Sequence, residues 1–305
     1  MNATWLAVTC AACIATTGCA QQLPEPNIAS SASEPAYAAT YPGRLEAIAK
    51  RVDDDESTAR TLQGRYLGYA DQLDNPAWDV VLTIVRAAHA AGRSQGYVEA
   101  RRSFAASRAF FEEEGPELTK KVAGTAQYVV KDKGCNVDVT GPITHALKEG
   151  IDKQSEKRLR SANEAQRIVE EYRDTLGKKN VAALEKQADE IAEVSYLIDV
   201  DIVEQKIALR RMLGDAEQVK KTIPDALVAE RAFQSSAGRT DAEKQASHQR
   251  IEALNKAQGD LERQIAAARK LDQAIEQRIE AARKAHQESF QKFEAIIQSR
   301  APAKK

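Results

Sequence analysis

The chain has 305 residues, of which 43% are hydrophobic and 29% charged, so it is too polar for a polytopic membrane protein and too apolar to be disordered throughout. Its 44 lysines and arginines nearly balance its 45 aspartates and glutamates, and the basic footprint of a nucleic-acid-binding protein is therefore missing. Aromatic residues make up only 5%, and the residues that dominate the second half are typical of long helices: Ala, Leu, Ile, Glu, Lys, Arg and Gln.

The first residues have the features of an export signal. Residues 3–15 are apolar and mostly small, and they are too few to span a membrane, which takes about 20 residues. Thr16-Thr17-Gly18-Cys19 follows, and this small residue before a cysteine resembles the lipobox of bacterial lipoproteins. The resemblance covers the signal segment only. It implies cleavage after Gly18, acylation of Cys19 and, with Ala20 next, sorting to the outer membrane of a Gram-negative cell.

Two alternatives to the lipoprotein reading remain at this point. An ordinary secretory signal cut near Ala20 would leave a soluble secreted chain, and the third reading is a cytoplasmic protein. We take residues 1–18 as the signal peptide and residues 19–43 as the lipidated cysteine with a disordered tether. The tether is predicted because its residues show no helical period and include four prolines, Pro24, Pro26, Pro35 and Pro42.

A short helical N-terminal subdomain is predicted over residues 44–131. Leucine and tyrosine repeat at helical spacing near the end of a first helix over 44–73. Asp74-Asn75-Pro76 supplies an N-cap and a first-position proline, so a second helix should begin at Pro76 and end at Gly115-Pro116. Residues 132–141 contain two glycines and several turn formers, and they are predicted to form a hinge loop.

Residues 142–300 should form a region of long helices with coiled-coil packing. Apolar residues recur every three or four positions from Pro142 to Leu176 and again from Leu184 to Met212, where Gln205 is one of the seam positions. Gly177 as a C-cap and Asn180 as an N-cap predict a hairpin between these stretches, although a continuous helix through Gly177 is an alternative. Thr222-Ile223-Pro224 predicts a break or a kink, and Ser235–Arg239 a turn.

The last helix has the strongest periodicity in the chain. Thr240 and Glu243 form a capping-box signature, so the helix should begin near Asp241 and run to Ser299, about 90 Å at 1.5 Å per residue. Residues 301–305 are predicted to be a disordered tail. Two heptad positions are apolar almost throughout: Leu254, Leu261, Ala268, Ile275, Ala282 and Ile296, and Ile251, Ile265, Ile279 and Phe293. The predicted fold is an all-α, elongated helical bundle or antiparallel coiled coil.

Three polar residues interrupt this seam at intervals of fourteen. Gln258, Asp272 and His286 occupy core positions, where buried polar side chains can fix the register with a partner helix or a second chain. The alternative is that the helix packs loosely there and the side chains reach water.

Cys135 is the one thiol left in the body after lipidation. It lies in the predicted hinge loop, and an odd cysteine in an oxidising compartment can form an intermolecular disulfide. A free thiol is the alternative. No histidine lies near it in the sequence to act as the base that a cysteine nucleophile requires.

Motifs for chemistry are missing from the rest of the sequence. No pair of the four histidines has metal-ligand spacing, no phosphate loop or nucleophile elbow occurs, and the run Asp53-Asp54-Asp55-Glu56 lacks the spacing of a calcium loop and reads as a solvated helix face. We therefore expect no catalytic residues, no metal, no cofactor and no enzymatic activity.

The expected function is that of an elongated scaffold, spacer or adaptor on the periplasmic or outer face of a membrane. Its partners would be the membrane, through the lipid anchor, and other envelope proteins or a second copy, with no nucleic acid. One alternative is a BAR-like dimeric module that binds or curves bilayers, for which basic residues within 148–173 would supply a charged face. Another is a helical pore-forming protein, for which the apolar run Val80–Val85 is far shorter than a membrane span.

Overall fold

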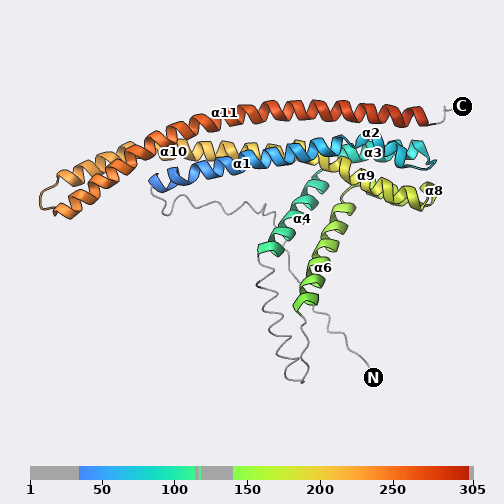
Figure 1. Cartoon of the computed structure of the whole chain (residues 1–305), viewed down its shortest axis with the longest axis horizontal. Coiled ribbons are helices and arrows are strands. Elements are labelled where there is room, and N and C mark those ends of the chain that lie inside the picture. The colour runs from blue at the N-terminus through green and yellow to red at the C-terminus, as the bar shows by residue number, and fades with distance from the viewer. Residues whose placement is uncertain (1–33, 114–116, 118–139, 302–305) are drawn as a thin grey trace, which may run out of the picture.

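A computed structural model describes residues 34–113, 117 and 140–301 of the chain. Within these ranges every regular element is helical, which confirms the predicted all-α class. Long helices lie side by side in a rod, and two further helices leave the rod as an arm (Figure 1). The signal segment, Cys19, most of the tether, Cys135 and all but the end of the expected hinge loop lie outside the described residues.

One half of the rod consists of three long helices, α1 (Glu34–Gln63), α10 (Ile202–Ser235) and α11 (Asp241–Arg300). α11 has 60 residues and is therefore about 90 Å long. It begins with the predicted capping box, in which Thr240 and Glu243 each accept a hydrogen bond from the other's backbone N–H. The apolar seam of α11 forms the core with α1 and α10, as its heptads predicted; the core includes Tyr41, Val52, Leu209, Met212, Leu261, Ala268 and Ile275.

α1 begins ten residues earlier than expected, so the predicted tether is wrong for residues 34–43. Pro42 lies inside this helix, where it lacks the N–H that would bond the carbonyl of Ala38. Gln264 of α11 replaces that donor, because its Nε2 donates to the Ala38 carbonyl at 3.2 Å. Tyr37 and Tyr41 are buried on the same segment, and this packing stabilises a helix that the local sequence disfavours.

The other half of the rod packs shorter helices around the C-terminal part of α11. They are α2 (Tyr66–Tyr69), η2 (Ala70–Gln72), α3 (Trp78–Ala91), α7 (Glu164–Glu171), α8 (Arg173–Leu176) and α9 (Lys178–Tyr196). Their apolar faces form one core with the aromatic end of α11, namely Tyr66, Val81, Val85, Val169, Leu184, Ile191, Phe290 and Phe293.

Two helix ends in this half differ from the expected caps. Gly177 has a φ of 76° and separates α8 from α9, which gives the predicted turn. Asn180 is not the N-cap of α9; it is buried, and its side chain bonds both backbone groups of Asp74 at 2.9 Å. α3 begins at Trp78 after Ala77, whose side chain forms no cap, rather than at Pro76.

A π-helix, η3 (Leu197–Asp201), joins α9 to α10. After it, Ile202, Leu209 and Met212 are buried as predicted, but Lys206 is buried between them in place of Gln205, which is half-buried. Lys206 compensates for its burial by an ion pair with Glu276 of α11. α10 then continues through Pro224 to Ser235, so the chain does not break at Pro224.

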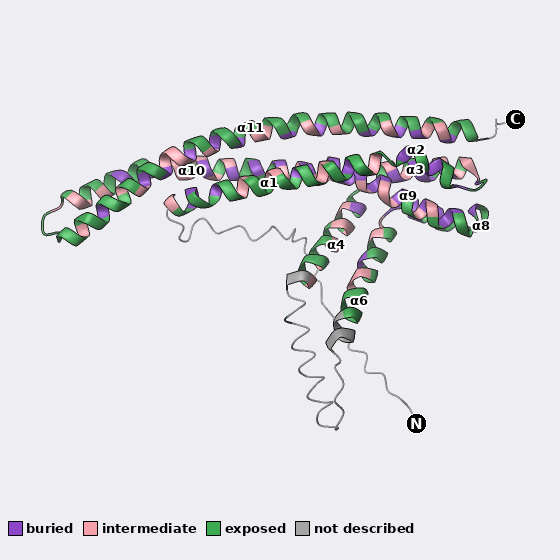
Figure 2. Ribbon diagram, in the orientation of Figure 1, coloured by how far each residue is buried: buried purple, intermediate pink, exposed green. Residues whose placement is uncertain are grey.

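The arm consists of α4 (Gln95–Glu113) and α6 (Thr140–Ser161), which pack against each other and leave the rod near η3 (Figure 1). The arm returns to the rod at Asn163, whose side chain accepts a hydrogen bond from the backbone of Ala165 at 3.0 Å and so caps α7. This cap divides the single seam expected between Pro142 and Leu176. Buried residues follow the rod, whereas most of the described arm surface is exposed or half-buried (Figure 2).

Candidate functional site

Polar side chains gather where the arm meets the rod, at η3. We call this region the junction. It consists of η3, the end of α9, the start of α4 and the facing parts of the chain that carry Asp55 of α1, Arg93 after α3 and Arg283 of α11. π-helices are uncommon and occur frequently at functional sites. Asp199 and Asp201 both lie in η3, and they contact different neighbours.

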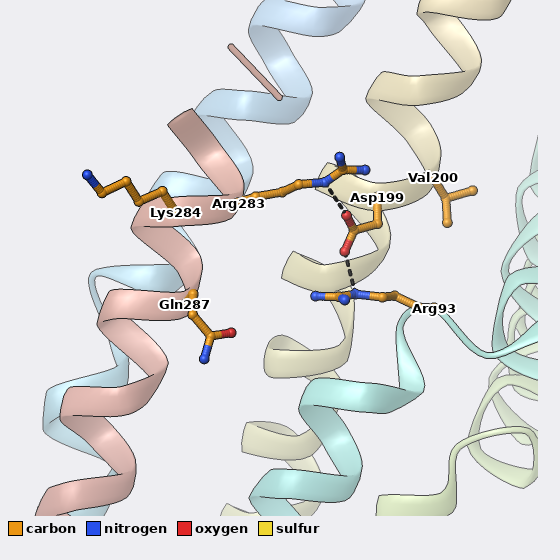
Figure 3. Close-up of a pocket in the computed structure, with 6 residues that line it drawn as sticks. All are labelled: Arg93, Asp199, Val200, Arg283, Lys284 and Gln287. Carbon is orange, nitrogen blue, oxygen red and sulfur yellow. Dashed lines mark hydrogen bonds and ion pairs between the residues drawn. The ribbon is translucent and has the colours of Figure 1, made fainter. Parts of the chain in front are cut away.

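Asp199 joins three separate elements. Its carboxylate contacts Nε of Arg93, after α3, at 2.5 Å and Nε of Arg283, in α11, at 2.7 Å (Figure 3). The Asp199 side chain is 11% exposed, whereas both arginines are about half exposed. An open groove of about 690 Å³ lies beside it and is also lined by Val200, Lys284 and Gln287. The three-residue bridge therefore fixes α3 and α11 to the π-helix.

The arm is attached to the rod by two further ion pairs. Arg101 of α4 binds Glu193 of α9 through both Nε, at 2.7 Å, and Nη2. One residue later, Arg102 pairs with Glu204 of α10. The Arg101 guanidinium also lies over the ring of Tyr196, 5.4 Å from its centroid. Because adjacent arginines bind different helices, they restrict both the tilt and the rotation of α4.

Asp55 and Asp201 are two carboxyl groups held partly away from water at the contact between α1 and η3. Burial raises the pKa of Asp55 to about 6, and the nearby charge of Asp201 raises it further, while Arg51 opposes the rise. Burial also raises the pKa of Asp201, against a hydrogen bond from Tyr196. Oδ2 of Asp55 is buried and has no hydrogen-bond partner within the described ranges. The run of acidic residues is therefore not simply a solvated face.

Substitution of Asp55 by asparagine should make the protein more stable at pH 7.5. The pKa of Asp55 is raised from 3.8 in the unfolded chain to about 6 in the fold, so its stabilising contribution is complete below pH 3.8 and is lost as the pH rises through 6. Two pKa units correspond to about 3 kcal/mol, which partial exposure reduces to about 1 kcal/mol. Urea unfolding of both proteins at pH 5 and pH 7.5 measures the difference.

The matched control for this prediction is Asp54→Asn, because Asp54 is the exposed neighbour on the same turn of α1. Its gain in stability at pH 7.5 should be much smaller than that of Asp55→Asn, because the charge of Asp54 is only a lesser cause of the raised pKa of Asp55. A gain in stability from Asp54→Asn equal to that from Asp55→Asn would show that the effect is general charge reduction, and the prediction would be wrong.

His286 forms a buried hydrogen-bonded chain between α2 and α9. Its Nδ1 lies 3.3 Å from the Tyr66 hydroxyl, and its Nε2 lies 3.1 Å from Oγ of Ser195. Ser195 donates its own proton to the carbonyl of His89 at 2.8 Å, so it accepts from Nε2–H, and Tyr66 donates to Nδ1. Burial, with smaller effects from His89 and Arg93, lowers the pKa of His286 to about 3. The imidazole is therefore neutral.

The pairing of Ser195 with His286 does not have the geometry of a catalytic dyad. The side chain of Ser195 is fully buried and its proton is bound to a carbonyl, so no substrate can reach Oγ. The second imidazole nitrogen faces a tyrosine rather than a carboxylate. This arrangement joins helices and positions side chains.

The other predicted seam residues lie outside the junction. Asp272 accepts hydrogen bonds from Nε and Nη2 of Arg210 at 3.0 and 3.3 Å, which joins α11 to α10 within one chain. Gln258 is half-buried near the hairpin end of α11. Asp272 and His286 thus have partners in their own chain, and Cys19 and Cys135 lie outside the described residues.

Sequence reasoning missed the charged residues of the junction. Arg93, Asp199 and Arg283 have no local pattern that sets them apart from other surface charges, since their meeting depends on the tertiary fold. Asp55 did carry a signal. It stands three residues after Val52 and four before Ala59, at a core position of the α1 seam.

Comparison with known proteins found no matching family model, no matching curated protein and no matching solved structure. Among the described residues, no helix is both long and apolar enough to cross a membrane. The same residues contain no group of three or more His, Cys, Asp or Glu side chains placed to hold a metal ion.

Proposed function

We propose that this chain is a non-enzymatic lipoprotein of the cell envelope, anchored through Cys19, whose rod acts as a scaffold, spacer or adaptor. The observation that carries this proposal is α11, which extends for 60 residues, about 90 Å, and is packed along its length by the other rod helices. A compact catalytic domain does not require such a helix. A spacer requires length, and packing along the whole rod supplies stiffness.

The arm supports the adaptor role. Helices α4 and α6 project sideways from the rod (Figure 1), and the ion pairs of Arg101 and Arg102 hold α4 at a fixed orientation. The protein thus presents three separate ends: the hairpin between α10 and α11, the opposite end of the rod near α8, and the arm. Distinct, rigidly related ends are what an adaptor between envelope proteins needs.

Two measurements test the anchor and the shape. In a Gram-negative host fed an alkyne-labelled fatty acid, the wild type should carry the label in the outer-membrane fraction, and Cys19→Ser should not. Small-angle scattering of the purified Cys19→Ser chain should give a maximum dimension of about 90 Å or more. A wild type without the label would contradict the lipid anchor, and a compact scattering profile would contradict the spacer role.

Site-specific photocrosslinking tests the scaffold role in the envelope. A photoreactive residue at Val228, 65% exposed near the hairpin end, or at Tyr172, 40% exposed near the other end, should capture defined partners. The same photoreactive side chain placed at position 46 instead reports which proteins contact the middle of the rod. Discrete adducts at the two ends support an adaptor, whereas no adducts at either end would contradict it.

A curved module that binds bilayers is the second candidate, and the visible arc of α11 in Figure 1 favours it. Liposome co-sedimentation of the Cys19→Ser chain distinguishes the two candidates. A scaffold without lipid affinity stays in the supernatant, whereas a bilayer-binding module pellets with anionic liposomes and is released by salt.

A further inference from the structure

Long polar side chains line the groove beside Asp199, which we call the junction groove. It lies between η3 and the part of α11 that carries Arg283 and Gln287, and Arg93 completes its wall (Figure 3). Its volume of about 690 Å³ is in the usual range for small-molecule sites. The lining is polar or charged except for Val200, so the groove suits a polar ligand.

Cations outnumber carboxylates in this lining. Arg93, Arg283 and Lys284 carry three positive charges, and Asp199 carries the one negative charge, which leaves an excess of two. Lys284 is exposed and forms no ion pair with any residue that the structure describes. Its ammonium group extends away from Asp199 in Figure 3, on a long and flexible stem that can turn towards a ligand. The junction groove is therefore a site of positive potential.

Asp199 holds the two guanidinium groups by one edge only. It contacts Nε of Arg93 at 2.5 Å and Nε of Arg283 at 2.7 Å, and no Nη atom of either arginine forms a hydrogen bond within the described ranges. Both arginine side chains are about half exposed, so these Nη donors are accessible from solvent. A guanidinium that a carboxylate already holds loses less conformational entropy when it binds a ligand. The Asp199 bridge thus positions two sets of free donors.

Gln287 lies between the two cations that α11 contributes. Position 287 is four residues after Arg283 and three after Lys284, so its side chain shares a face with both. The amide is exposed and forms no hydrogen bond with a described residue, and in Figure 3 it points from α11 towards the side of Arg93. Glu280 and Glu288, the nearest carboxylates on α11 in the sequence, do not line the groove.

We propose that the junction groove binds the phosphate group of a phosphate monoester. At neutral pH such a group carries close to two negative charges, which match the excess of two in the groove, whereas a single carboxylate would offset only one. Its oxygens accept hydrogen bonds from the Nη groups of the two arginines, the ammonium of Lys284 and the amide of Gln287. The site goes beyond the scaffold role and does not depend on the lipid anchor, because all of its residues lie at the junction.

Isothermal titration calorimetry with glycerol 3-phosphate tests the site on the purified Cys19→Ser chain. Saturable binding is expected, and acetate at the same ionic strength should not saturate the site over the same concentration range. Gln287→Glu should raise the dissociation constant about tenfold or more, because it places a negative charge between Arg283 and Lys284. Gln287 is exposed and forms no hydrogen bond with a described residue, so this substitution removes no contact of the fold.

Vesicles distinguish a phosphorylated lipid headgroup from a soluble phosphate monoester. Co-sedimentation of the chain with vesicles that contain phosphatidic acid, reversed by glycerol 3-phosphate, supports a headgroup. Binding of glycerol 3-phosphate without co-sedimentation supports a soluble ligand. Phosphatidylglycerol vesicles of equal surface charge are the control, because their phosphate is a diester with a single charge.

Gln298→Glu is the matched control for Gln287→Glu. Gln298 is also exposed on α11, and it lies about 16 Å farther along the helix, which is about twice the screening length at physiological salt. Its substitution should leave the dissociation constant of glycerol 3-phosphate unchanged. Equal weakening by both variants would mean attraction by the net charge of the whole chain, and the absence of saturable binding would mean that there is no site; either result overturns the proposal.

Discussion

Replacement of Gly92 by alanine is expected to lower the free energy of unfolding by about 3 kcal/mol. Gly92 lies just after α3, where that helix touches α9. A Cβ atom at this position would lie 2.1 Å from the carbonyl oxygen of Ala192 and 2.5 Å from Cβ of Ser195. The nearest of these atoms belongs to the backbone, so rotation of a side chain cannot relieve the overlap, and the two helices must separate.

The loss should not come from backbone strain at Gly92. Its φ of −57° and ψ of −21° are ordinary for alanine, which also reduces the entropy of the unfolded chain. Separation of α3 from α9 instead stretches the 2.8 Å hydrogen bond from Ser195 to the carbonyl of His89, next to His286. Chemical denaturation followed by circular dichroism measures the change in stability.

Gly96→Ala is the matched control, four residues later at the start of α4. Its added Cβ would lie 3.8 Å from the nearest atom, the carbonyl oxygen of Ala162, which is an ordinary contact. This variant should be as stable as the wild type or more stable by up to about 1 kcal/mol, since alanine favours a helix over glycine. Equal destabilisation by both variants would mean that close packing at Gly92 is not the cause.

The long helices could be predicted because their signals are local and repeat many times. Along α11 the apolar positions recur through sixty residues, and the Thr240 capping box marks the start, so no knowledge of the partners was needed. The same periodicity also identified His286 as a polar residue at a core position. It did not identify the partners of His286, because Tyr66 lies 220 residues away in the sequence.

The start of α1 could not be predicted for the opposite reason. Pro42 and a run of small residues argue locally against a helix. The hydrogen bond that compensates for Pro42 comes from Gln264, 226 residues after Ala38. Likewise, Gln205 was placed on the seam where Lys206 is buried, because the partner that compensates for the burial of Lys206 is Glu276, 70 residues away in the sequence. Local pattern determines the elements, and tertiary contacts determine these exceptions.

Acid should destabilise the fold through His286, and His286→Gln should reduce that sensitivity. Burial lowers the pKa of His286 from 6.5 in the unfolded chain to about 3 in the fold. The unfolded chain therefore binds more protons between these values, and the stability contributed by the neutral imidazole is lost as the pH falls from 6.5 towards 3. At pH 4.5 the loss relative to pH 7.5 should be about 2 kcal/mol.

The measurement is the difference in unfolding free energy between wild type and variant at each pH, because carboxyl groups that titrate in both proteins then cancel. His286→Gln is expected to be less stable than the wild type at pH 7.5, since glutamine cannot bond Tyr66 and Ser195 in the same geometry. The gap should narrow at pH 4.5, because protonation of His286 stabilises the unfolded state of the wild type but not that of the variant.

His248→Gln separates this effect from general histidine titration. His248 lies on the same helix, but its side chain is 60% exposed and faces solvent beside Glu252. Its pH profile should match that of the wild type. Some acid sensitivity should survive in His286→Gln, because burial also lowers the pKa of His89, whose ring stacks on His286 at 4.7 Å. If the curves of wild type and His286→Gln run parallel from pH 7.5 to 4.5, the buried imidazole does not control acid stability, and the destabilising protons bind elsewhere.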